Sequence, residues 1–306
     1  MTSAVITGAT STLGLATLEE LVSHNVMVYA LVRKDSQKIS RIPKSSLVTL
    51  IECDLSQMKD FVPLENQKAE VFYHFAWGST DKNIRDNPLP QLENMQHEID
   101  AVNLAFRFGC KKFIGAGSQA EYGVIRELIT EESRVDPLTS YGVAKYASGK
   151  LTGKLCGQLG MEFIWPRIFS VFGGGETPNT MLSYAIRCAL SGQKAKFSAA
   201  TNDWDYLYKT DLARWFYALG SEEIPSGVYN IASGKSRVLK DYIIELAKVV
   251  EEETGKKLDY EFSSDPIGPF VPYLKCDISK VVKATGIEPK IPFAEGIKKL
   301  LSSIGV

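Results

Sequence analysis

A tyrosine and a lysine four residues apart, Tyr141 and Lys145, are the side chains whose types and spacing most clearly indicate chemistry. The surrounding sequence SYGVAKYASGKLTGKLCGQLG has the periodicity of a helix, and positions i and i+4 of a helix share a face. We therefore expect both polar groups to point into one pocket. An ammonium beside a buried phenol stabilises the phenolate, so the tyrosine pKa, about 10 in water, is expected to fall toward the range of a proton donor or acceptor. Taken alone, the pair fits a solvated helix surface better.

A serine upstream and a glycine-containing turn near the N-terminus strengthen the catalytic interpretation. Ser118 follows KKFIGAG, an apolar run typical of a buried strand, and open parallel sheets bind ligands at the carboxyl ends of their strands. SAVITGAT predicts a strand ending at Gly8, and TLGLATLEELVSHN predicts an amphipathic helix directly after it. Such a turn gathers backbone N–H groups and the positive end of the helix dipole, which suits a pyrophosphate.

Together, Tyr141 with Lys145, Ser118 and the TGATSTLG turn resemble the extended short-chain dehydrogenase/reductases, the NAD-dependent epimerase/dehydratase family, whose members mostly act on nucleotide sugars. The resemblance implies an α/β fold with a doubly wound parallel sheet, a Rossmann fold, and a smaller C-terminal α+β substrate lobe. It also implies that Tyr141 transfers the proton, that Lys145 lowers the tyrosine pKa and binds the nicotinamide ribose, and that Ser118 hydrogen-bonds the substrate carbonyl oxygen.

The order of predicted elements indicates where the two domains divide. From Gly173 onward strands and helices lose strict alternation, which suggests a smaller lobe, and GVYNIASG at residues 227–234 is expected to return to the sheet. The dinucleotide-binding domain is therefore expected at residues 1–172 and 207–235, and the substrate-binding lobe at residues 173–206 and 236–306.

The glycine turn departs from the family pattern at its middle position. Gly8 and Gly14 match the first and last of three glycines, but Ser11 stands at the second. Serine is small and can donate a hydrogen bond, so a close approach of the phosphates is still expected. The residues of this turn that the resemblance places at the cofactor are Gly8, Thr10, Ser11, Thr12, Leu13 and Gly14.

The end of the second predicted strand, VMVYALVRK, bears on the choice of cofactor. NAD-preferring Rossmann proteins usually place an Asp or Glu there to bind the ribose diol. This chain has Arg33 and Lys34 instead. A guanidinium and an ammonium without a carboxylate favour a 2′-phosphate, although both could be solvated loop charges. We expect NADPH, with NAD as the alternative.

Other segments match the family block by block. LVTLIECDLSQ resembles the third strand, whose Asp lies near the adenine, and EVFYHFAWGST carries the His-x-Ala signature, in which His74 is expected to be structural. The polar stretch at residues 79–93 predicts a loop before a helix that begins near Asn94. The further residues that the resemblance places around the cofactor are Asp54, Leu55, Phe75, Ala76, Trp77, Asn94, Pro166 and Phe169.

The substrate side departs most from the family. Ser170 replaces the Asn of a Leu-Arg-x-x-Asn-Val-Tyr-Gly stretch, and Trp204 replaces the Arg of an Arg-Asp-Phe-x-x-Val-x-Asp block. Tyr273 stands where a second Arg often precedes the late Asp-x-Ser-Lys block. In family members these two Arg residues commonly grip the diphosphate of the sugar nucleotide. The expected substrate-binding residues are Ser118, Gln119, Ser170, Trp204 and Tyr273, and the candidate phosphate partners, or else surface charges, are Arg167, Arg187 and Arg237.

The residues after Ser118 separate the reactions of the family. Sugar-nucleotide 4,6-dehydratases carry Asp-Glu there, and GDP-fucose-synthase-like enzymes carry a Cys at the second position, whereas this chain has Gln119 and Ala120. Two reactions remain: NAD(P)H-dependent reduction of a nucleotide-linked 4-keto-(6-deoxy)hexose, which Arg33 and Lys34 favour, and NAD-dependent 4-epimerisation. A non-catalytic NADP-sensing regulator would need no Tyr/Lys pair and is disfavoured.

Composition argues against other classes of protein. The 306 residues are 44% hydrophobic and 23% charged, as in an ordinary globular chain, and no apolar run approaches the roughly 20 residues that span a bilayer. A net charge of −1 with scattered cations gives no footprint for nucleic acid. Five cysteines without a CxxC pair and three histidines without ligand spacing predict core thiols and no metal. We expect a cytoplasmic protein, not bound to membranes, that by analogy with the family forms a homodimer.

Overall fold

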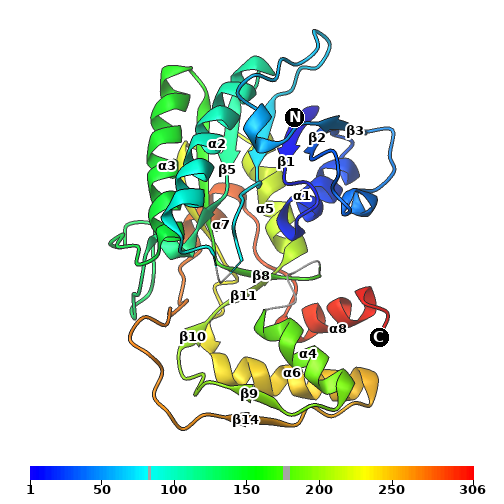
Figure 1. Ribbon diagram of the computed structural model, residues 1–306, viewed down its shortest axis with the longest axis vertical. Helices are drawn as coiled ribbons and strands as arrows, with labels where there is room; N and C mark the ends of the chain where they lie inside the picture. The colour runs from blue at the N-terminus through cyan, green and yellow to red at the C-terminus, as the bar shows by residue number, and fades with distance from the viewer. Residues whose placement is uncertain (82–83, 175–179) are drawn as a thin grey trace.

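The sheet that organises the molecule is parallel throughout. The computed structural model describes residues 1–81, 84–174 and 180–306, and in it the strand order is β12-β7-β5-β4-β1-β2-β3, with β6 beside β7 (Figure 1). The order reverses between β1 and β4, which is where a doubly wound sheet opens a crevice for a ligand. The predicted fold class is confirmed. The strands are β1 (Ser3–Thr7), β2 (Met27–Val32), β3 (Val48–Glu52), β4 (Val71–His74), β5 (Lys112–Gly115), β6 (Gly117–Ser118), β7 (Glu162–Ile168) and β12 (Gly227–Ile231).

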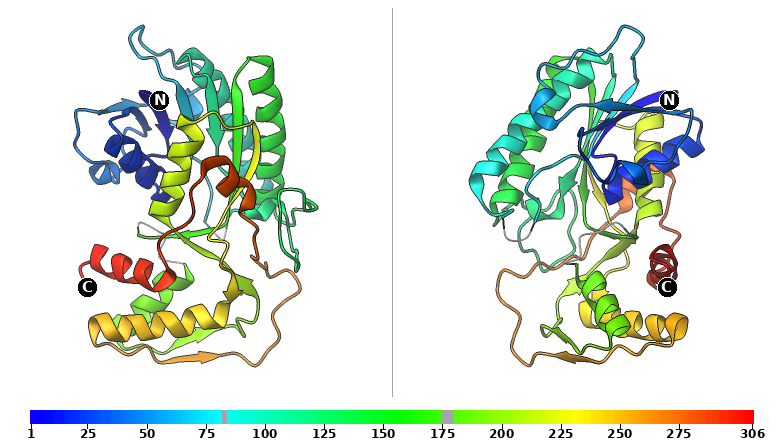
Figure 2. Two further views of the ribbon diagram at one scale, coloured as in Figure 1. Left: turned by 180° about the vertical axis from the view of Figure 1, so that it is seen from behind. Right: turned by 45° about the vertical axis from the view of Figure 1, so that its right-hand side comes forward.

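Helices cover both faces of this sheet. On one face α2 (Pro88–Arg107) packs along α3 (Ser140–Gln158), and on the other α1 (Thr12–Ser23) packs along α5 (Lys209–Ser221), as Figures 1 and 2 show. Because both faces are covered, the central strands are nearly continuous runs of buried apolar residues. Among the helices of the described ranges, none is long and apolar enough to cross a lipid bilayer.

A smaller lobe lies at one end of the sheet domain (Figure 1). Its apolar cluster joins α4, α6 and α8 and includes Leu182, Leu246 and Ile297. The residue division between the two domains stays a prediction. The elements outside the main sheet are β8 (Ser170–Phe172), α4 (Met181–Ser191), β9 (Ala195–Phe197), β10 (Asp203–Trp204), β11 (Tyr206–Tyr208), β13 (Arg237–Val238), α6 (Leu239–Thr254), β14 (Tyr260–Phe262), α7 (Ser279–Thr285) and α8 (Phe293–Ser303), with short 3-10 helices η1 (Ile39–Arg41), η2 (Leu55–Gln57) and η3 (Gln119–Glu121).

The predicted start of α2 is wrong by six residues. The helix begins at Pro88 rather than near Asn94, because the Asn87 side chain accepts a hydrogen bond from Leu89 N at 3.1 Å and caps it. Prolines in the first turn break no hydrogen bond, since those N–H groups have no partner within the helix. Residues 82–83 of the predicted loop lie outside the described residues. Asn94, the seventh residue of the helix, accepts from Gly78 N at 2.8 Å and donates to Gly78 O at 2.9 Å.

The cysteines lie in the apolar interior, as predicted. All five are buried and unpaired, and burial raises the pKa of Cys53 to about 11 and that of Cys156 to about 12. Both thiols therefore stay protonated at neutral pH, and they pack as small apolar groups.

Candidate active site

The turn between β1 and α1 forms a cradle of backbone atoms. Gly8 has φ +68°, and a Cβ there would lie 2.7 Å from Ala76 N. A Cβ on Gly14 would lie 2.3 Å from the carbonyl oxygen of Gly8. Ser11 caps α1 by accepting a hydrogen bond from Gly14 N at 3.1 Å. Because the chain approaches itself this closely only through glycine, and the helix N-terminus opens beside it, the cradle fits the pyrophosphate of a dinucleotide.

We expect Gly14→Ala to weaken dinucleotide binding by roughly ten- to a hundredfold, since overpacking of this kind typically costs 1–3 kcal/mol. The added methyl meets a backbone carbonyl oxygen, so α1 has to move away from the turn. Calorimetric titration with NADPH and NADH measures the loss. Gly157→Ala, a helical position where the added methyl meets nothing within 4 Å, is the matched control and should bind as the wild type does. Wild-type affinity in the Ala variant would contradict the assignment of the cradle.

Ser118 and Tyr141 come together at the carboxyl edge of the sheet. Ser118 ends β6 and is 8% exposed, and hydrogen bonding by its side chain lowers the pKa of Tyr141. Tyr141 lies in the first turn of α3, which Thr139 caps by accepting from Gly142 N at 3.1 Å. The Tyr141 ring also meets the ring of Trp77 edge-on, with 6.0 Å between their centroids. The structure therefore places the predicted proton-transfer group and the predicted carbonyl-binding hydroxyl side by side.

Lys145 lies beneath this pair, inside the fold. Its Nζ donates to the carbonyl oxygen of Ala116 at 2.7 Å and lies 3.4 Å from the ring centroid of Trp77. The side chain is 4% exposed. Burial lowers the pKa of Lys145 to about 8, against the carboxylates of Glu98 and Glu121, which raise it. The charge on Lys145 is consequently sensitive to pH near neutrality.

The expected direction of the Tyr141 pKa is wrong in this structure. Burial is the largest cause and raises this pKa, whereas the hydrogen bond with Ser118 and the guanidinium of Arg85 lower it. The ammonium of Lys145 is engaged by Ala116 and Trp77 instead. Desolvation of the phenolate therefore outweighs the favourable neighbours.

Arg85 is a residue of this site that the sequence did not single out. Its Cζ lies 4.9 Å from the Tyr141 ring centroid. The neighbouring Asp86 fixes the segment, because its Oδ1 accepts from Ser140 N at 2.6 Å and its carbonyl oxygen accepts from Ser140 Oγ at 2.8 Å. The segment before α2 thus places the guanidinium of Arg85 over the ring of Tyr141.

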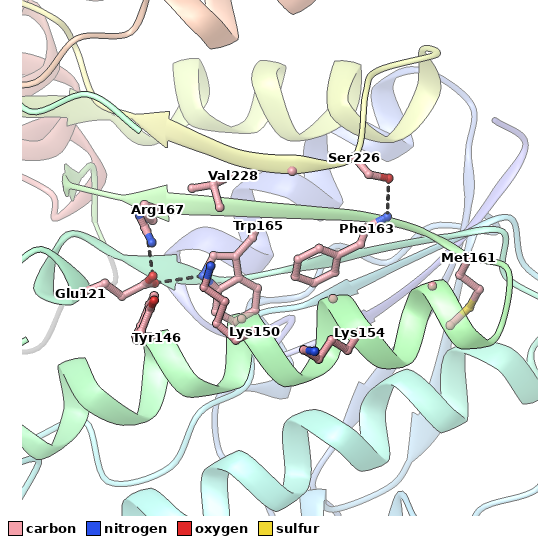
Figure 3. Close-up of a pocket in the computed structure, with 14 residues that line it drawn as sticks. Glu121, Tyr146, Lys150, Lys154, Met161, Phe163, Trp165, Arg167, Ser226 and Val228 are labelled. Atoms are coloured by element: carbon pink, nitrogen blue, oxygen red, sulfur yellow. Dashed lines mark hydrogen bonds and ion pairs between the residues drawn. The ribbon is translucent and has the colours of Figure 1, made fainter. Parts of the chain in front are cut away.

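A buried carboxylate holds the backbone of Ser118. Glu121 is fully buried, and its Oε1 accepts from Ser118 N at 2.9 Å and from Trp165 Nε1 at 3.0 Å. Its Oε2 accepts from Arg167 Nε at 2.7 Å. Figure 3 shows the contacts of Glu121 with Trp165 and Arg167 at one end of a cavity of about 440 Å³ between α3 and β7. Arg167, 4% exposed, is therefore an internal ion-pair partner of Glu121. The alternative that it is a surface charge is wrong, and its role as a phosphate partner stays a prediction.

The remaining cofactor candidates lie along the same edge. Arg33 and Lys34 follow β2 and are exposed, and the unpredicted Arg41 donates from Nη1 to the carbonyl oxygen of Thr10 at 3.2 Å. Asp54 caps η2 by accepting from Ser56 N at 3.1 Å. The other positions are the start of α1 (Thr12, Leu13), the first residue of η2 (Leu55), the turn after β4 (Phe75, Ala76, Trp77) and the end of β7 with the residue after it (Pro166, Phe169).

His74 lies beneath the turn after β4. It is buried, and its Nδ1 is 2.8 Å from Thr7 Oγ1. Burial lowers the pKa of His74 to about 3, so the ring is neutral at physiological pH. This placement fits the predicted structural role.

The predicted substrate residues are spread more widely. Gln119 opens η3 directly after Ser118, and Ser170 opens β8 two residues after Ile168, the strand partner of Ser118. Trp204, in contrast, lies on β10 and packs on the apolar cluster that contains Phe169. The ring centroid of Tyr273 lies 5.2 Å from Arg126 Cζ. Arg237 pairs with Glu245 and lies 4.0 Å from the Tyr242 ring centroid, and Arg187 lines a cavity of about 460 Å³ beside Gly174.

Comparisons with known proteins agree with this fold. A model of the family described as NAD dependent epimerase/dehydratase matches residues 4–232. The dTDP-4-dehydro-6-deoxyglucose reductase of Escherichia coli is 24% identical, over 98% of this chain and 96% of its own. MoeE5 in complex with UDP-glucose and NAD has a TM-score of 0.83 at 21% identity, covering 99% of this chain and 98% of its own. The UDP-glucose 4-epimerase of Thermotoga maritima with UDP-glucose has a TM-score of 0.83 at 20% identity, with the same coverage.

Proposed function

Since the chain belongs to the NAD dependent epimerase/dehydratase family, we propose that it reduces a nucleotide-linked 4-keto-(6-deoxy)hexose with NADPH as the cofactor. The similarity to the Escherichia coli dTDP-4-dehydro-6-deoxyglucose reductase over nearly the full length of both chains supports this substrate class. The nucleotide, the sugar and the stereochemistry of the product depend on contacts in the smaller lobe, where the sequence of this chain departs from the family pattern.

Side chains of the protein have separate roles at the carbonyl oxygen of the substrate. The cofactor, when bound in the β1–α1 cradle, supplies the hydride. Ser118 donates a hydrogen bond to the substrate oxygen, and Tyr141 delivers the proton to it. Arg85 provides positive charge beside Tyr141, Lys145 lies against Trp77, and Glu121 holds the backbone of Ser118.

Positive charge at the end of β2 is the observation that carries the reductase proposal. The last residue of β2 is Val32, and Arg33 and Lys34 follow it with exposed side chains. Arg41, which reaches the carbonyl oxygen of Thr10, brings a third cation to the cradle. Three cations near the adenosine end of the predicted site favour a cofactor with an additional phosphate.

We expect NADPH to bind more tightly than NADH, and Arg33→Asp to erase or reverse this preference. Each charge-assisted hydrogen bond to the phosphate contributes roughly 1.5–3 kcal/mol, so losing one costs on the order of ten- to a hundredfold in affinity. Calorimetric titration with both cofactors measures the effect. Lys44→Asp, an exposed cation further along the same segment, is the matched control and should leave the ratio unchanged.

The alternative is an NAD-dependent nucleotide-sugar 4-epimerase. The similarity to the Thermotoga maritima UDP-glucose 4-epimerase supports it, and Asp35 offers an exposed carboxylate shortly after β2 for a ribose diol. Equal affinity for NADPH and NADH, or NAD retained through purification and seen by native mass spectrometry, would replace the reductase with this reaction.

We also propose that the chain forms a homodimer through α2 and α3. Large apolar side chains are exposed on both helices, with Leu92 and Phe106 on α2 and Val143 and Leu151 on α3. Exposed apolar residues gathered on one helix pair are typical of a protein–protein contact. The family resemblance points to the same two helices.

A further inference from the structure

Glu98 of α2 is a buried carboxyl group that the proposed chemistry does not use. It is 0% exposed, and neither of its side-chain oxygens has a hydrogen-bond partner among the described residues. Its Oε2 lies 3.8 Å from His74 Nε2, and a Cβ on Gly115 would lie 3.0 Å from its Oε1. An ionised carboxylate in such a place is costly unless a positive charge compensates it.

The titratable groups around Glu98 come from every element that packs on it. Helix α2 itself contributes the neighbouring His97, and strand β4 contributes one ring that faces the carboxyl group. The others reach it from α3 and η3. These groups are His74 from β4, Tyr141, Lys145 and Cys156 from α3, Glu121 from η3, and His97.

Most of these neighbours carry no charge that is available to Glu98. His74 is neutral, because burial lowers its pKa to about 3, and Cys156 is a thiol, because burial raises its pKa to about 12. Glu121 is already paired with Arg167 at 2.7 Å. Lys145 is the ammonium that remains. Its Nζ binds the carbonyl oxygen of Ala116 at 2.7 Å, and the preceding residue, Gly115, is the one packed against Glu98 Oε1. At this position the carboxylate of Glu98 favours the charged form of Lys145.

We propose that Glu98 is a positioning residue for Lys145, the buried carboxylate that keeps this ammonium charged beneath Ser118 and Tyr141. Helical spacing supports the placement, since Asn94 and Glu98 share the face of α2 that meets the sheet and the turn after β4. The ring of His74 packs beside Glu98: its Nε2 faces the carboxyl group, and its Nδ1 contacts Thr7 Oγ1.

Loss of the carboxylate has a definite consequence for Lys145. Burial by itself lowers the Lys145 pKa, and opposite charges nearby oppose that fall. We therefore expect Glu98→Gln to shift the midpoint of the Lys145 titration from about 8 downward by about one pH unit. The consequence for turnover rests on the proposed function: the alkaline fall in kcat/KM should move to lower pH by the same amount.

Glu98 makes the free energy of unfolding depend on pH in the opposite sense from a carboxylate in an ordinary structural ion pair. Burial raises the pKa of Glu98 to about 7, above its value in the unfolded chain. The folded state therefore binds this proton more tightly, and the free energy of unfolding falls as pH rises from the unfolded value through 7. Glu98→Gln removes that loss, so relative to the wild type the variant gains stability as pH rises through this window.

The deciding experiment follows Lys145 in the cofactor-free protein. Protein labelled with ¹³C at the lysine ε carbons is titrated by NMR between pH 6 and 11, values chosen to bracket the pKa of about 8. The Lys145 resonance is identified by its loss in Lys145→Arg. Glu98→Asp, which keeps a shorter carboxylate, should titrate between the wild type and Glu98→Gln.

An unchanged Lys145 midpoint in both Glu98 variants would overturn the proposal. Should Glu98→Gln fail to fold, the Asp variant decides alone, because its carboxylate lies farther from Lys145 and a lowered midpoint is then required. A lowered midpoint with no turnover on any nucleotide sugar would support the role of Glu98 while refuting the proposed function. The two inferences can thus fail separately.

Discussion

Tyr141→Phe is expected to lower kcat by roughly 10²- to 10⁴-fold, the range that a general acid typically contributes. The substitution removes only the hydroxyl, whose pKa the Ser118 side chain lowers. The ring can keep its edge-on contact with Trp77 and its position beneath Arg85. Binding of the dinucleotide should therefore change little. Steady-state kinetics on a panel of nucleotide-linked 4-keto-6-deoxyhexoses, with calorimetric titration of NADPH, measures both quantities.

Tyr146→Phe is the matched control for this variant. Tyr146 lies on the same helix and lines the cavity of about 440 Å³ shown in Figure 3, next to Lys150. Its loss of a hydroxyl should leave kcat unchanged. If Tyr141→Phe keeps more than about a tenth of the wild-type kcat, Tyr141 is not the general acid.

The meeting of Ser118 and Tyr141 was predictable from the sequence for a topological reason. Ser118 ends an apolar strand, and Tyr141 begins a helix with a clear cap. In a parallel sheet the strands end, and the following helices begin, on the same edge. Local sequence patterns were sufficient here, because the fold class brings the end of the strand and the start of the helix together at one edge of the sheet. The same argument locates the cradle between β1 and α1.

The charged groups beneath this pair were not predictable in the same way. A glutamate inside an amphipathic helix is usually solvated, and the burial of Glu98 depends on how α2 packs against β4 and β5. One signal was present: Glu98 follows Asn94 by four residues and so shares its face. For Arg167, strand alternation puts its side chain on the same face as Trp165, where both reach Glu121.

The Tyr141 pKa shows why residue spacing alone cannot give electrostatics. Four residues on a helix bring Lys145 to the correct face but do not fix where its flexible chain ends. In the structure that chain ends at Ala116 and Trp77, and burial then dominates the tyrosine. The cation that lies over the ring is Arg85, from a segment 56 positions earlier by sequence number.

Ser118→Ala should lower kcat by about 10²- to 10³-fold, as removal of one oxyanion-stabilising donor typically does. The backbone of the variant should stay in place, because Glu121 binds the N–H of residue 118 rather than its hydroxyl. The hydroxyl also accepts a hydrogen bond from Ala120 N at 3.2 Å, and it lowers the pKa of Tyr141. A lower kcat therefore measures the loss of the hydroxyl and not a displacement of the end of β6.

Ser118→Thr keeps the hydroxyl and is the control that separates chemistry from packing in this test. It should retain kcat within about tenfold of the wild type, whereas Ala does not, and both variants should bind NADPH with wild-type affinity. Steady-state kinetics resolves kcat from KM for each variant. A raised KM with unchanged kcat in the Ala variant would show that Ser118 binds the ground state and the transition state equally, and the hydroxyl would then contribute to binding alone.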